Sequence, residues 1–123
     1  MQALANFFVG LSAFEHIYFM VLEMFLWTTP RACKAFGMTP EFAKSTAAIA
    51  ANQGLYNGFL AMGLIWSLIN RDPMMSMGLK IFFLGFIVVA GIYGGKTVNK
   101  KIFFVQSIPA AIGLIFVFLS YSN

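Results

Sequence analysis

Four long stretches of mostly apolar residues constrain the fold of this chain more than any other feature. They cover residues 4–27, 46–69, 76–96 and 102–121. Crossing roughly 30 Å of hydrocarbon takes about 20 helical residues, so each stretch is long enough for one span. With 123 residues, 60% of them hydrophobic and 10% charged, the chain has more apolar surface than a soluble core of this size could bury. The sequence therefore predicts an all-α integral membrane four-helix bundle in a single domain, surrounded by the lipid bilayer.

The connections between these stretches contain residues typical of helix ends. Residues 39–41 (Thr-Pro-Glu) supply an N-cap, a proline at the first helical position and an acid in the first turn. The second helix is therefore expected to begin before the membrane. Residues 72–73 (Asp-Pro) repeat the signal before the third helix, and residues 94–96 (Gly-Gly-Lys) are expected to close it.

The positions of the basic residues predict the orientation of the helices. The first and third loops carry most of them: Arg31, Lys34, Lys44, Lys96, Lys100 and Lys101. The second loop has Arg71 with Lys80 nearby. Because loops rich in lysine and arginine stay in the cytoplasm, loops one and three should face inward and both termini outward. The basic residues form no stripe interleaved with aromatics, so no nucleic-acid partner is expected.

Two acids and the only histidine interrupt the first apolar stretch: Glu15, His16 and Glu23. Ionisable groups at membrane depth cost roughly 2.5 to 3.5 kcal/mol each on insertion scales, so they usually serve a function. At about 100° and 1.5 Å per residue, His16 and Glu23 share a face but lie about 10 Å apart, too far to bind one metal ion directly. With one histidine and no cysteine at membrane depth, no metal site is predicted.

The second helix supplies polar partners over an arc of about 140°: Asn52, Gln53, Tyr56 and Asn57. Glycine pairs four residues apart, Gly54 with Gly58 and Gly91 with Gly95, would let the first three helices pack closely around these groups. Tyr93 and Gln106 fall in the same cytoplasmic half and complete the predicted ligand-binding or proton-linked set. In the last helix, Pro109 removes a backbone donor, which predicts a kink or a widened pocket wall.

Structural explanations for the polar residues stand beside the functional ones. The amides could serve only to bond helices together, at about 0.6 kcal/mol per contact. His16 could be a neutral imidazole bonded to an amide. The acids are harder to explain structurally, because glutamine would make the same bonds without a charge.

Several short motifs spread over nearly the whole chain point to one family. They are Glu15-His16, Val105-Gln106 and the segments 22–27, 29–31, 36–38, 50–59 and 90–94. With these motifs the chain resembles a family of bacterial membrane proteins catalogued as domain of unknown function 1304. Ala32 stands where that family commonly has glycine, a difference confined to a loop. The resemblance implies a four-span, multi-pass protein of the bacterial inner (plasma) membrane and no established activity.

Three functions remain open from the sequence. The first is binding or transport of a small or amphipathic ligand with proton linkage, a layout similar to that of the small multidrug transporters but without their motifs. The second is an intramembrane enzyme acting on a lipid-like substrate, although no nucleophile–base pair or cofactor motif is present and no cofactor is expected. The third is a structural accessory subunit. The sequence leaves open whether the protein forms a homo-oligomer.

Overall fold

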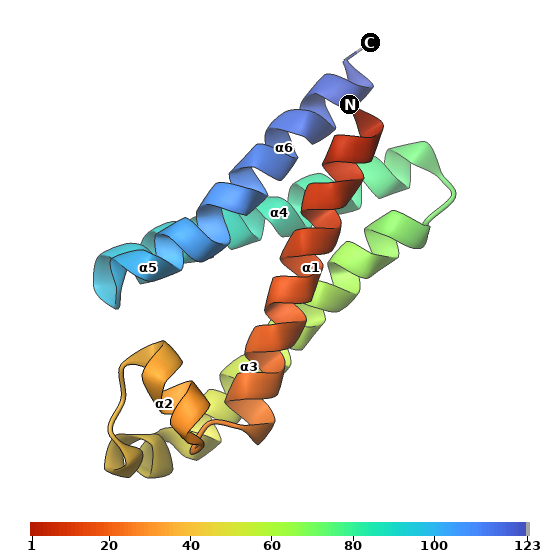
Figure 1. The fold of residues 1–123 in the computed structure, drawn as a ribbon. Helices are drawn as coiled ribbons and strands as arrows, with labels where there is room; N and C mark the ends of the chain where they lie inside the picture. The colour runs from red at the N-terminus through yellow and green to blue at the C-terminus, as the bar shows by residue number, and fades with distance from the viewer. Residues whose placement is uncertain (123) are drawn as a thin grey trace. The chain divides into compact units, whose positions relative to one another are not determined.

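The protein is built from helices, as the sequence predicts. The computed structural model describes residues 1–122, and no strand occurs among them. The helices are α1 (Gln2–Phe25), α2 (Pro30–Phe36), α3 (Pro40–Ile69) and α4 (Pro73–Thr97), followed by α5 (Lys100–Ile102), the π-helix η1 (Phe103–Ser107) and α6 (Ile108–Tyr121) (Figure 1).

Three helical segments in the described part of the chain are long and apolar enough to cross a membrane: α1, α4 and the continuous segment Lys100–Tyr121. The second predicted span, residues 46–69, lies in α3, which has 30 residues but is not one of these three segments. The amides Asn52, Gln53 and Asn57 lower its apolar character. The membrane character of the chain is therefore supported, whereas the count of four spans and the sides of the termini stay predictions.

The chain divides into two compact units. One contains Met1–Glu15 together with the chain from Met62 onward, and the other contains His16–Ala61. Helices α1 and α3 each contribute residues to both units. The organisation as a single domain stays a prediction.

In the first unit, α4 packs along η1 and α6. The glycines of α4 make this contact close, since a β-carbon built at Gly91 would overlap the hydroxyl of Ser107, and one at Gly95 would lie 2.6 Å from the β-carbon of Phe103. The sequence predicts that these glycines pack the first three helices together. Their nearest neighbours instead belong to the segment that precedes α6, namely η1. Helix α1 joins the same unit through Phe8, which stacks on Phe116 with ring centroids 5.8 Å apart.

In the second unit, α1 and α3 approach each other at the glycines of α3. A β-carbon at Gly54 would lie 2.7 Å from Cγ of Met24, and one at Gly58 would lie 2.7 Å from the sulfur of Met20. The indole of Trp27 donates a hydrogen bond of 3.0 Å to the hydroxyl of Thr46, which ties the end of α1 to α3.

The predicted helix starts are confirmed by their capping bonds. The hydroxyl of Thr39 accepts from the amide of Phe42 at 3.2 Å, and Asp72 accepts from the amides of Met74 and Met75 at 2.9 and 3.2 Å. The third predicted span ends at residue 96, and α4 ends one residue later, at Thr97. The helix continues past residues 94–95 to Thr97, because these glycines serve as a packing surface for α5 and η1.

Two local elements were not predicted. Helix α2 occupies the first loop, where Thr29 caps its start and Gly37 ends it with a φ of 64°, in the left-handed region that favours glycine. The second is the π-turn η1, in which the amide of Ile108 donates to the carbonyl of Phe103. It ends two residues before Pro109, so the distortion expected near this proline takes the form of a widened helical turn.

Candidate functional site

One predicted acid and one predicted amide meet in the second unit. Nδ2 of Asn57 on α3 donates to Oε1 of Glu23 on α1 at 2.5 Å, and both side chains are half-buried. Gly54 makes this approach possible, because a β-carbon there would lie 3.0 Å from the β-carbon of Glu23. A membrane-length helix thus presents a carboxyl group that is held by a neighbour but still partly accessible.

The other polar residues of α3 point elsewhere. Asn52, Gln53 and Tyr56 are exposed. At about 100° per residue, Asn52 lies about 140° around the helix from Asn57, so one side of α3 cannot present all four residues to α1. Tyr56 packs edge-on against Phe59 at 5.9 Å. Of these four residues, Asn57 is the one that hydrogen bonds an acid.

Glu15 and His16 differ in their surroundings although they are neighbours in sequence. His16 is only 1% exposed and contacts the ring of Phe19 edge-on at 5.6 Å. Glu15 is half-buried, and within residues 1–122 its buried oxygen Oε2 has no hydrogen-bond partner. Because buried polar atoms are normally satisfied, this carboxyl group is unusual and stays a candidate for proton exchange.

Tyr93 and Gln106 belong to the first unit. Tyr93 is exposed on α4, and its carbonyl accepts from the hydroxyl of Thr97 at 2.8 Å. Gln106 is half-buried within the π-turn η1. The structure therefore describes these two residues separately from the Glu23–Asn57 pair.

Lys80 is a buried polar residue that the sequence presents only as a basic residue near the second loop. It is 2% exposed, and its ammonium group donates to Oδ1 of Asn6 at 2.8 Å. Tyr121 is close enough to interact with it electrostatically. The cap at Asp72 could have identified Lys80 as a residue within a helix. In a helix that begins at Pro73, residue 80 lies about 10 Å along the helix axis from the first residue.

No three histidine, cysteine, aspartate or glutamate side chains of residues 1–122 lie close enough together to hold a metal ion. Cys33 is a half-buried free thiol on α2.

Comparison with known proteins places the chain in a family. Residues 10–118 match the family model described as "Protein of unknown function (DUF1304)". The chain is also similar to the "Uncharacterized protein YpaA" of Lactococcus lactis subsp. lactis (strain IL1403), with 31% identity over 107 residues that cover 85% of this chain and 88% of the relative. No solved structure matches the chain. The chain therefore belongs to the DUF1304 family of proteins of unknown function.

Proposed function

We propose that this protein is a multi-pass protein of the bacterial inner membrane that binds or transports a small amphipathic ligand and exchanges a proton at Glu23. The hydrogen bond between Asn57 and Glu23 is the observation that carries the proposal. It holds a carboxyl group in a helix of membrane length, and both partners remain partly accessible. Ionisable groups in such positions usually mark a ligand or proton pathway.

The chemistry of the pair favours a ligand with a positive charge. Without a ligand, a carboxyl group in the membrane is least costly when it carries a proton. An arriving cation can replace that proton, which leaves for water while the carboxylate neutralises the ligand. Asn57 can donate to either form of the acid, so it orients the group throughout the exchange. A role for the other residues of the predicted set stays a prediction: Glu15, His16, Asn52, Gln53, Tyr56, Tyr93 and Gln106.

A contact in the first unit supports four spans over three. Asn6, near the start of α1, accepts a hydrogen bond from Lys80, near the start of α4. If α1 and α4 both cross the membrane and begin on the same side, the chain between them must cross back once. Helix α3 is the segment between them that is long enough, since its 30 residues extend about 45 Å.

A second candidate function is that of an accessory subunit. The exposure of Asn52, Gln53 and Tyr56 on α3 favours it. Amides that face lipid lack hydrogen-bond partners, so a second copy or another membrane protein could cover this face.

Proton release on ligand binding tests the first function. Purified protein in weakly buffered detergent is mixed with tetraphenylphosphonium, an amphipathic cation, and protons are measured with a pH-sensitive dye. We expect about one proton per bound cation in the wild type, since one carboxyl group is exchanged. Glu23→Gln should release none, because glutamine keeps the acceptor for Asn57 but has no proton to exchange.

Glu41→Gln provides the matched control, because Glu41 is exposed in the first turn of α3. It should release protons as the wild type does. Equal release from Glu23→Gln and wild type, or cation binding without proton release in the wild type, would contradict the proposal. If no variant binds the cation but Asn52→Leu and Tyr56→Phe disrupt an assembly, the accessory role is supported instead.

A further inference from the structure

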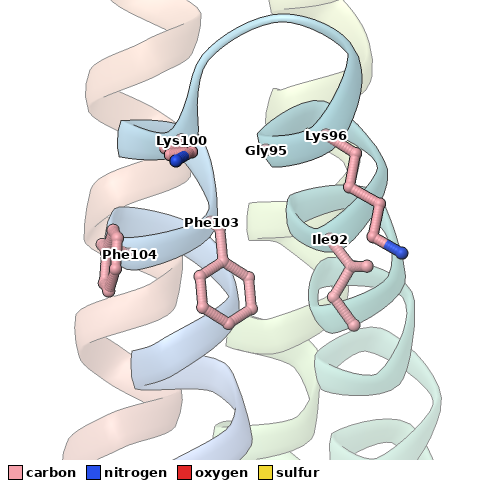
Figure 2. A pocket seen from close by; sticks show the side chains of 6 residues that line it. All are labelled: Ile92, Gly95, Lys96, Lys100, Phe103 and Phe104. Carbon is pink, nitrogen blue, oxygen red and sulfur yellow. The ribbon is translucent and has the colours of Figure 1, made fainter.

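A groove opens in the first unit where α4 turns into α5 (Figure 2). Its volume is about 420 Å³, within the range of roughly 300 to 1,000 Å³ common for small-ligand sites. Two lysines and an apolar wall line it, namely Ile92, Gly95, Lys96, Lys100, Phe103 and Phe104. Figure 2 shows the ring of Phe103 between the two helical segments and the side chain of Lys96 extending back along α4 towards Ile92.

Backbone contacts hold the two walls of this groove in place. Gly95 lets Phe103 approach α4, because a β-carbon there would lie 2.6 Å from the β-carbon of Phe103. The turn is tied by the amides of Val98 and Asn99, which both donate to the carbonyl of Gly94 at 2.9 and 3.1 Å. Oδ1 of Asn99 caps α5 by accepting from the amide of Lys101 at 2.9 Å. The groove is therefore part of the folded helix connection.

The charges at the groove have no acidic counterpart in their part of the chain. Lys96 and Lys100 are exposed, and residues 73–123 contain no aspartate or glutamate. A lysine ammonium carries three donors on a flexible stem, so both side chains can turn towards one anionic group. The site therefore favours a ligand with a compact negative charge.

The apolar residues add a second requirement for the ligand. Ile92 and Phe104 are exposed beside the lysines, and both lie on segments of membrane length. A free inorganic anion would use the lysines and leave these side chains uncovered. A lipid headgroup brings a phosphate and also the first carbons of its acyl chains, which fit such a wall.

We propose that the groove formed by Lys96, Lys100, Ile92 and Phe104 binds an anionic phospholipid, with its phosphate at the two ammonium groups. Its glycerol and acyl carbons lie along the apolar wall. The orientation predicted from the basic loops places this turn at the cytoplasmic surface, where anionic lipids attract clustered lysines. The groove shares no residue with the Glu23–Asn57 pair, so either proposal can fail without the other.

Lipid binding by the whole protein tests this site. Detergent-purified protein is titrated with phosphatidylglycerol or phosphatidylcholine of identical acyl chains, and bound lipid is counted by native mass spectrometry. We expect phosphatidylglycerol to bind the wild type about ten-fold more tightly, and Lys96→Gln/Lys100→Gln to lose this preference. Lys96→Arg/Lys100→Arg keeps both charges and should keep the preference for phosphatidylglycerol. This variant distinguishes the loss of charge from a loss of folding.

Lys101→Gln is the matched control, because Lys101 lies in the same turn but does not line the groove. It should change the affinity for phosphatidylglycerol by less than about two-fold, since a charge outside the groove contributes only general attraction. A loss as large as that of the double glutamine variant would overturn the proposal. Displacement of the lipid by millimolar inorganic phosphate would also overturn it, because the site would then bind the free anion.

The apolar wall has its own test. Phe104→Ala should weaken phosphatidylglycerol binding by about three-fold or more, since it removes apolar contact with the lipid. Phe118→Ala, another exposed phenylalanine of the first unit, should not weaken binding. Equal effects of the two substitutions would show that the groove makes no specific contact with the acyl chains.

Discussion

Lys80 shows how much a single buried charge depends on one neighbour. The residue is 2% exposed, and the amide oxygen of Asn6, at the exposed end of this contact, accepts a hydrogen bond from its ammonium group. When a buried charge loses its hydrogen-bond partner, nothing offsets the free-energy cost of removing that charge from water. Asn6 therefore contributes to stability mainly through Lys80.

This dependence predicts an asymmetric pair of substitutions. Asn6→Leu should lower the free energy of unfolding by about 1 to 3 kcal/mol, because the ammonium group is left without its acceptor. Lys80→Met should lower the free energy of unfolding by less than Asn6→Leu does. The double variant Asn6→Leu/Lys80→Met should be more stable than Asn6→Leu alone, since an apolar pair of similar size needs no hydrogen-bond partner. Unfolding in mixtures of dodecyl maltoside and sodium dodecyl sulfate measures all three. Simple addition of the two single effects in the double variant would refute the dependence.

The sequence indicates buried acids more readily than buried bases in this chain. Glu23 interrupts the middle of an apolar stretch, whereas Lys80 lies near a loop, where a basic residue indicates topology as readily as burial. The partner of Glu23 could not be predicted, because the spacing of residues 52–57 places several amides near α1 but does not set the angle at which two helices cross. The contact with Asn57 comes from that crossing.

At the scale of the helices, glycines determine how closely neighbours approach. Gly91 lies against Ser107, whose hydroxyl donates to the carbonyl of Val88 at 2.8 Å. This bond links α4 to η1 at the point of closest approach. By contrast, a β-carbon built at Gly85 on the same helix would have no neighbour within 4 Å.

The two glycines predict opposite effects of one substitution. Gly91→Ala should lower the free energy of unfolding by about 1 to 3 kcal/mol, because its β-carbon would overlap Ser107. Gly85→Ala should be neutral or raise stability by up to about 1 kcal/mol, since alanine is the better helix former. Unfolding in the same detergent mixtures compares them. A gain in both variants would mean that helix propensity, rather than packing, decides the effect.

Helix starts could be predicted here, whereas short elements could not. Thr39 and Asp72 cap their helices through side chains next to a proline, a signal contained within a few residues. Helix α2 has 7 residues and only one face to bury, so no periodic pattern identifies it. The π-turn depends on packing against α4, which lies outside its own sequence.

At the scale of the whole molecule, the direction of α3 decides the topology. If α3 crosses the membrane, the loop before it and the loop after it lie on opposite sides. If it lies along the surface, the two loops share a side. Its amides make it less apolar than the other long helices, so composition alone does not separate these arrangements.

Labelling from one side of the membrane separates them. In a Cys33→Ser background, single cysteines replace three exposed, uncharged residues: Ala35, Met74 and Val98. A maleimide that cannot cross membranes should label the cysteine at 74 in intact spheroplasts and those at 35 and 98 only in inverted vesicles. Labelling of positions 35 and 74 from the same side would rule out four spans.

The π-turn before Pro109 has a consequence for how this chain could change in length. A turn closed between residues five apart contains one residue more than an ordinary α-helical turn. Removing a single residue between Phe103 and Ser107 could therefore restore a regular helix while Ala110, Gly113 and Val117 keep their places in the core. In a tightly packed helix, this is a position where the chain can lose a residue without rotating everything that follows.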